Sequence, residues 1–178
     1  MFNVVLAFNG IKYEKPVQKK GNITIVTDKD KRGPIFFNEV LREHEAILYG
    51  FLPEDTKFEH SFVLWNILEK FKQYKDDIGC VYSDYLIEYS HIQSCVHHYL
   101  MSYDVFDMQS KAIFAPFFVN HRFFKTTLFN ENMKAAYYHD AIMKISQRCL
   151  IYHYPEPLLS FPSSEFKHCQ TIEKELLQ

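Results

Sequence analysis

At residues 46–58 the chain reads AILYGFLPEDTKF, an apolar strand pattern that runs directly into an acidic pair, Glu54 and Asp55. In an open α/β sheet, ligands bind in the crevice outside the carboxyl ends of the strands, where carboxylate oxygens can hold a divalent cation. We therefore expect Glu54 and Asp55 to face a cleft and to hold Mg²⁺ or Mn²⁺ against a diphosphate. Pro53 comes just before them, at a place where a further carboxylate would strengthen the pattern.

The composition of the whole chain is typical of a folded protein. Its 178 residues are 47% hydrophobic and include 17 Phe and 12 Tyr, which is too apolar for a disordered protein. The length predicts a single compact domain over residues 1–178. The net charge of -2 gives no general attraction to nucleic acid, so we expect no nucleic-acid partner.

The cysteines and the apolar runs bear on the compartment. Four cysteines include no CxxC pair of the kind that holds zinc. No apolar run approaches the roughly 20 residues that cross a bilayer, and the first residues lack the pattern of a signal peptide. We expect a cytoplasmic protein without a transmembrane segment, and a virus-encoded protein passes the same tests.

Strand-like and helix-like patterns alternate in the first half of the chain, which favours a mainly parallel sheet flanked by helices. The expected strands lie at 2–8, 22–28, 46–52, 77–90 (a long strand or a hairpin), 111–120 and 150–161. The expected helices lie at 35–45, 58–74, 121–129, 135–149 and 165–178, and 91–112 is expected to be irregular with a short strand.

Two helices have a clear apolar periodicity. In the helix at 58–74, helical spacing places on one face Phe58, Phe62, Trp65, Leu68 and Phe71. In the helix at 135–149, the residues expected to point inward are Ala141, Ile142 and Ile145.

Three carboxylates, Asp28, Asp55 and Asp84, stand at the ends of expected strands. Single acids at such positions commonly cap helices or begin turns, but together they suggest a ligand site. In that site Asp28 would contact a nucleoside and Asp55 a cation that bridges phosphate oxygens. His139 and Asp140 lie on the penultimate helix, where adjacent residues point about 100 degrees apart and do not form a dyad.

The remaining histidines give weaker signals. His97 and His98 have no metal-binding spacing, so a structural or surface role is expected for both. His153 lies within an aromatic strand pattern and is expected to be a hydrogen-bonded core residue.

Taken in order, several segments resemble the inverting family-two glycosyltransferases with a GT-A fold. They are ITIVTD at 23–28, RGPIFFNEVL at 32–41, AILYGFLPEDTKF at 46–58, DIGCVYSDYLI at 77–87, and the long run at 113–161 that contains IYHYP. The resemblance covers roughly residues 22–161. It implies an α/β, GT-A-like three-layer sandwich with a mainly parallel central sheet.

The same resemblance implies a function and a set of site residues. The protein would transfer a sugar from a nucleotide-sugar donor to an acceptor that the sequence does not identify, with Mg²⁺ or Mn²⁺ as cofactor. Asp28 and Asp84 would bind substrate, and Asp55, with Glu54, would bind the metal. Asp140, or His139 in its place, would act as the base that deprotonates the acceptor.

The sequence departs from the family where catalysis takes place. Pro53 replaces the first acid of the metal motif, and Tyr137 and Tyr138 occupy the positions of the acids that open the catalytic helix. Asp140 matches only the acid that follows. The alternative is therefore a catalytically inactive GT-A-like module that binds a protein partner in an assembly such as a viral particle.

Overall fold

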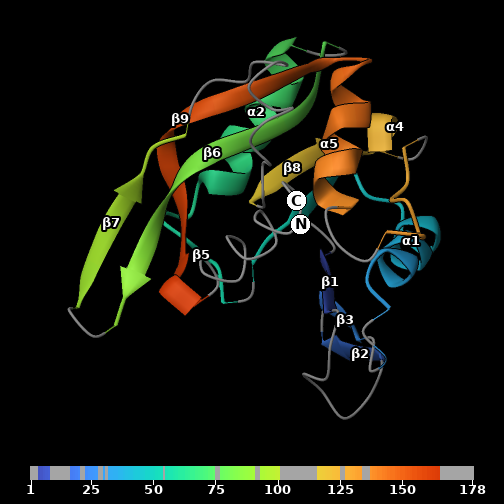
Figure 1. The fold of residues 1–178 in the computed structure, drawn as a ribbon, viewed down its shortest axis with the longest axis horizontal. Helices are drawn as coiled ribbons and strands as arrows, with labels where there is room; N and C mark the ends of the chain where they lie inside the picture. Colours follow the sequence, from blue (N-terminus) through green and yellow to red (C-terminus); the bar gives the residue numbers. More distant parts are fainter. Residues whose placement is uncertain are drawn as a thin grey trace.

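The strands that the structure describes form two separate sheets (Figure 1). The computed structural model describes residues 4–8, 17–20, 23–27, 30, 32–53, 55–74, 77–90, 93–100, 116–124, 127–133 and 137–164. The expected helix at 165–178 and the candidate residues Asp28 and Glu54 lie outside these described residues.

The larger sheet has the strand order β4-β8-β6-β9-β5, and β7 pairs with β6 beside this path. Its strands are β4 (Leu48–Phe51), β5 (Lys57–Phe58), β6 (Ile78–Tyr89), β7 (Ser94–His98), β8 (Phe117–Asn120) and β9 (Leu150–Pro162). The sheet curls strongly into a half-barrel, with the long strands β6 and β9 at its centre (Figure 1).

The prediction of a GT-A-like sandwich with a mainly parallel sheet is wrong. Within the described part of the large sheet, only β6 and β9 pair in parallel. The pairs β4–β8, β5–β9, β6–β7 and β6–β8 are all antiparallel. Between β6 and β7 the link is residues 90–93, which is far too short for a parallel crossover and makes these two strands a hairpin.

The smaller sheet contains the first strands of the chain. It has the order β1-β3-β2, formed by β1 (Val4–Phe8), β2 (Val17–Lys20) and β3 (Ile23–Thr27). β1 and β3 are parallel, whereas β2 runs antiparallel to β3. The predicted strands at 2–8 and 22–28 are thus confirmed, but they do not join the sheet that contains β4.

Helices cover both faces of the large sheet. Val81 and Phe118 pack with the helix α2 (Val63–Tyr74) on one face, whereas Cys80 and Phe117 pack with α5 (Tyr137–Ser146) on the other. Neighbouring strand residues serve opposite faces because side chains alternate along a strand. The further helices α1 (Pro34–Glu43) and α4 (His121–Phe124) confirm two shorter predicted helices.

The predicted buried face is confirmed for α5 but not for most of α2. The inward residues predicted for α5 are confirmed, since Ala141, Ile142 and Ile145 are each 0% exposed. In α2 the predicted face is wrong at Phe62 and Trp65, which are 67% and 52% exposed, but Phe71 is buried as predicted. The other residues that α2 buries are Val63 and Ile67.

Gly79 allows α5 to lie close to β6. A Cβ atom at Gly79 would overlap the Sγ atom of Cys149, which follows α5. No helix within the described residues is long and apolar enough to cross a membrane.

Candidate functional site

The predicted acidic edge after β4 is an exposed turn. Asp55 is exposed and has a φ of 56°, and the Thr56 hydroxyl donates a hydrogen bond of 2.7 Å to the carbonyl of Pro53. Among the residues that the structure describes, no three His, Cys, Asp or Glu side chains are grouped so that they could hold a metal ion. The described residues alone therefore do not form a Mg²⁺ or Mn²⁺ site around Asp55, whose metal-binding role stays a prediction.

The predicted base residues on α5 are engaged or shielded. The Asp140 carboxylate lies 2.6 Å from the Nζ atom of Lys144, one turn further along the helix. The Nδ1 atom of His139 is buried and has no hydrogen-bond partner among the residues that the structure describes. Burial lowers the pKa of the His139 imidazole, and the nearby Asp140 carboxylate only partly opposes this shift.

Tyr137 and Tyr138 belong to a packed cluster of rings at the end of β4. The Tyr138 ring lies 5.8 Å from that of Phe51 and 5.5 Å from that of Phe129, measured between ring centroids. Tyr137 contacts Phe129 edge-on at 5.5 Å. We call Phe51, Phe129, Tyr137 and Tyr138 the aromatic cluster. It fills the space beside α5 where the resemblance predicts acids.

Asp84 is the centre of a different polar cluster, in the middle of β6. Asp84 is 2% exposed, yet its carboxylate accepts three hydrogen bonds from groups far apart in the sequence. Oδ1 accepts from the Nε2 atom of His153 at 2.8 Å and from the backbone N–H of Leu100 at 2.9 Å. Oδ2 lies 3.1 Å from the Nε2 atom of His97.

These hydrogen bonds keep Asp84 ionised. Burial, the largest single influence, raises the pKa of the Asp84 carboxyl, but the bonds from Leu100, His153 and His97 together outweigh burial and lower the pKa below its usual value. An ionised carboxylate only accepts hydrogen bonds, so both imidazoles must carry a proton on Nε2. In its neutral form, each ring then has its lone pair on Nδ1.

The strand pairings explain how these residues meet. Tyr82 is the register partner of His153 in the parallel β6–β9 pair, and their rings stack with centroids 4.9 Å apart. The β6–β9 register shifts on both sides of Asp84, and the extra residues lie in β9, where the partner changes from Tyr154 to Pro157 and then to Leu159. The β6–β7 hairpin brings His97 to the same place from the other side.

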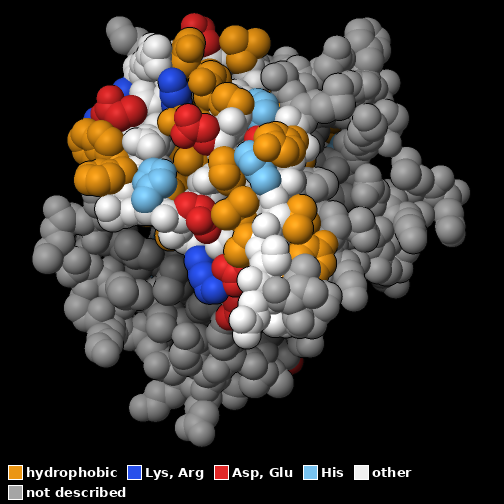
Figure 2. Space-filling view, turned by 90° about the vertical axis from the view of Figure 1, so that its left-hand side faces the viewer, with side chains coloured by type: hydrophobic (Ala, Val, Ile, Leu, Met, Phe, Trp, Pro, Cys, Tyr) orange, Lys and Arg blue, Asp and Glu red, His pale blue; other side chains and the backbone are white. Residues whose placement is uncertain are grey.

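An exposed ring lies beside His97. Tyr99, just past β7, is 74% exposed and stacks on the His97 ring with centroids 3.8 Å apart. The His97 side chain is 27% exposed, whereas that of His153 is 8% exposed. On the side of the molecule that carries β7, histidine and acidic side chains lie among apolar ones (Figure 2). His97 is therefore the imidazole of this cluster that solvent or a ligand reaches more readily.

The sequence identified Asp84 as a candidate site residue but not its contacts with His97 and His153. Asp84 was expected at a strand end, whereas it lies within a strand of twelve residues. The expectation that His153 is a hydrogen-bonded core residue is confirmed. His97 was expected to be structural or on the surface, and no local pattern indicates its contact with Asp84, because the β6–β7 pairing brings the two residues together.

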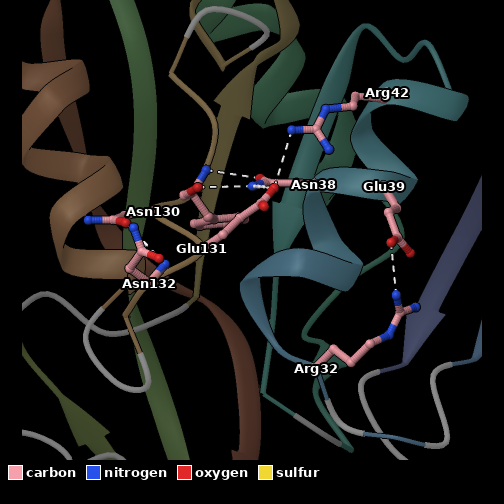
Figure 3. A network of polar contacts seen from close by, with 8 residues as sticks. Arg32, Asn38, Glu39, Arg42, Asn130, Glu131 and Asn132 are labelled. Atoms are coloured by element: carbon pink, nitrogen blue, oxygen red, sulfur yellow. Dashed lines mark hydrogen bonds and ion pairs between the residues drawn. The ribbon is translucent and has the colours of Figure 1, made fainter.

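A second polar network ties α1 to the loop before α5 (Figure 3). Asn38, 1% exposed, donates to the carbonyl of Phe129 and to the Glu131 carboxylate, both at 2.9 Å, and accepts from the Phe129 N–H at 2.9 Å. Arg42 also contacts Glu131, at 3.2 Å. Because every polar atom of the Asn38 amide is used within the protein, this network reads as structural support.

A shallow hollow of about 380 Å³ lies at the start of β4 and the end of β8. It is lined by Glu45, Ala46, Ile47, Asn120, His121 and Arg122. The hollow contains none of the residues of the Asp84 cluster, so the two are separate features.

This chain matches no known protein-family model, and no curated protein matches its sequence. The candidate site is therefore defined by its own geometry.

Proposed function

We propose that this protein transfers a sugar from a nucleotide-sugar donor to an acceptor hydroxyl. The proposal rests on the chemistry of the site and not on a shared fold, because one chemistry recurs on unrelated folds. The observation that carries it is the buried Asp84 carboxylate, which hydrogen-bonds to the imidazoles of His97 and His153.

The positions of two segments support this proposal. The resemblance to family-two glycosyltransferases rests partly on DIGCVYSDYLI at 77–87 and on IYHYP at 151–155. These segments pair as β6 and β9, and Asp84 of the first bonds to His153 of the second. Residues that carry the resemblance thus meet in one polar cluster within an apolar sheet.

The chemistry of the cluster suits the reaction. When a hydroxyl attacks the anomeric carbon of a nucleotide sugar, its proton must pass to a base. An imidazole whose Nε2–H is held by a buried carboxylate is oriented for this task, as in other catalytic sites that use a His–Asp pair. Asp28 as nucleoside contact and Asp55 as metal ligand are further parts of the proposal that the described residues leave untested.

A donor-hydrolysis and transfer assay tests the proposed function. The full chain is incubated with a panel of uridine, guanosine and thymidine diphosphate sugars, with Mg²⁺, with Mn²⁺ and with a chelator, and release of the nucleoside diphosphate is measured. The proposal expects release with at least one donor, and Asp84→Asn should lower it. Absence of release from every donor, together with absence of nucleotide binding by calorimetry, would overturn it.

A second candidate function, a noncatalytic binding module in a larger assembly, is supported by the aromatic cluster. Tyr137 and Tyr138 occupy the positions of the family's acids and pack against Phe51 and Phe129, which leaves no carboxylate at those positions. For such a module, the double variant Asp84→Asn/Asp140→Asn should keep its partner in a co-purification experiment. Loss of the partner in that folded variant would argue against a purely structural role.

A further inference from the structure

We propose that His97 is the group that accepts the proton from the acceptor hydroxyl, and that His153 positions the carboxylate that orients it. This inference rests on the proposed function and assigns to His97 the role that the resemblance implies for Asp140 or His139. It begins from the geometry of the Asp84 carboxylate, to which His97 and His153 donate from opposite neighbouring strands.

The contact with Asp84 decides the tautomer of His97. Its Nε2 atom lies 3.1 Å from Oδ2 of Asp84, an oxygen that can only accept. The proton of the neutral ring is therefore on Nε2, and Nδ1 carries the lone pair.

The Asp84 carboxylate is held in a fixed orientation. Oδ1 of Asp84 is held by the Leu100 N–H and by His153, whose own ring stacks on Tyr82. Two donors on Oδ1 fix the rotation of the carboxylate, and Oδ2 is thereby aimed at His97. His153 acts on the reaction through Asp84 and is a positioning residue.

His97 is more available for proton transfer than the candidate acid and base on α5. The Asp140 carboxylate is paired with Lys144 at 2.6 Å, and the Nδ1 atom of His139 is buried away from solvent. The His97 side chain is 27% exposed and borders the ring of Tyr99, which is 74% exposed. Within the described part of the chain, the charged and titratable groups that face His97 are Asp84 from β6, with His153 behind it on β9, and Tyr99 on its own segment.

The step balances without any oxidant or reductant. The oxygen of the acceptor hydroxyl forms a bond to the anomeric carbon while Nδ1 of His97 takes its proton. The bond from the anomeric carbon to the diphosphate oxygen breaks, and the nucleoside diphosphate leaves with the electron pair. His97 becomes an imidazolium that the Asp84 carboxylate stabilises.

The kinetic experiment compares His97→Gln with His153→Gln and with a control. Gln retains an N–H donor near the position of Nε2 but has no basic atom, so both variants can keep their bond to Asp84. His97→Gln should lower kcat by about 10²–10⁴-fold with little change in the KM of the donor, and it should remove the acid limb of the pH–rate profile.

The role of His153 is tested by two variants. His153→Gln should keep kcat within about tenfold of wild type. His153→Phe keeps a ring on Tyr82 but loses the bond to Asp84, so it should lower kcat by at least about tenfold. The control is the exposed His60→Gln, which should retain full activity.

The outcomes separate the two proposals. Transfer by wild type that His97→Gln retains would overturn only the role of His97, whereas no release from any donor and no nucleotide binding by wild type would overturn the proposed function. A second measurement does not need turnover: ¹⁵N NMR of the ring nitrogens should find neutral His97 as the Nε2–H tautomer in wild type and a tautomer mixture in Asp84→Asn. Neutral His97 found as the Nδ1–H tautomer in wild type would overturn the inference directly.

Discussion

The imidazole of His153 on β9 donates a hydrogen bond of 2.8 Å to the carboxylate of Asp84 on β6, although 69 residues separate them in the sequence. This bond joins the only two strands of the described large sheet that run in parallel. It places a titratable group at the centre of the sheet, where a carboxylate without partners would be strongly unfavourable. The following predictions test this arrangement and the packing around it.

Loss of the Asp84 charge should change how stability depends on pH. Because hydrogen bonds lower its pKa in the folded state, ionised Asp84 stabilises the fold above its usual pKa of 3.8, and this contribution is lost as the pH falls through the folded-state pKa. Asp84→Asn should cost about 1–3 kcal/mol at neutral pH. Urea unfolding from about pH 6 to about pH 3 should find that the gap to wild type narrows with acid. A gap that widens with acid would contradict the assigned charge state.

Gly79→Ala should destabilise the packing of α5 on β6. The new methyl group would overlap Sγ of Cys149, so we expect a loss of about 1–3 kcal/mol in the free energy of unfolding. Cys149→Ala removes the sulfur, and the double variant should therefore lose less than the sum of the two single variants. Additive losses in urea unfolding would show that the overlap is not the cause.

The buried face of α2 can be tested within one helix. Ile67 is 0% exposed and packs against the sheet, so Ile67→Ala should cost about 2–5 kcal/mol. Leu64 is 44% exposed, and Leu64→Ala is the matched control with an expected change within about 0.5 kcal/mol. Chemical denaturation of both variants distinguishes the faces, and equal losses would mean that α2 also buries its outer stripe.

Asn38 should matter more than the acid beside it. Asn38→Ala would leave both the N–H and the carbonyl of Phe129 without this partner, and we expect a loss of about 1–3 kcal/mol. The control is Glu39→Gln, which removes only the exposed ion pair with Arg32 and should cost less than about 1 kcal/mol. Thermal unfolding measures both variants, and a harmless Asn38→Ala would disprove the support that this network gives to the loop.

The thiols should differ in reactivity. Burial raises the pKa of Cys149 to about 11 and raises that of the buried Cys80 further, so neither should react readily with iodoacetamide at neutral pH. Cys95 is exposed and should be labelled first. Peptide mass spectrometry after short labelling checks this order, with unfolded protein as the control in which all four cysteines of the chain react. Early labelling of Cys80 would indicate that the sheet opens locally.

Several parts of the fold follow from the sequence because one local pattern decides them. The inward face of α5 is set by Ala141, Ile142 and Ile145, the residues at which its apolar periodicity is unambiguous. In α2 the pattern has two apolar stripes, and the helix begins only at Val63, so Phe58 lies in β5 instead. Periodicity identifies such a helix but does not decide which stripe meets the sheet.

Strand direction is a different kind of problem. The apolar pattern of 77–90 predicts a strand whichever way its neighbours run, and only the short link after Tyr89 favours a hairpin. The antiparallel pairing of β8 with both β4 and β6 depends on contacts between distant segments. The resemblance to a parallel α/β fold misled the prediction at this point.

The sequence by itself determined where most of the described strands and helices form, although not β2 and β5, and it identified Asp84 as a candidate site residue, because these predictions depend on residue type and local spacing. Only the tertiary structure decided that His97, Asp84 and His153 belong together. Strand pairing brings His97 and His153 to opposite sides of Asp84, and hydrogen bonds between such distant residues leave no periodic trace in the chain.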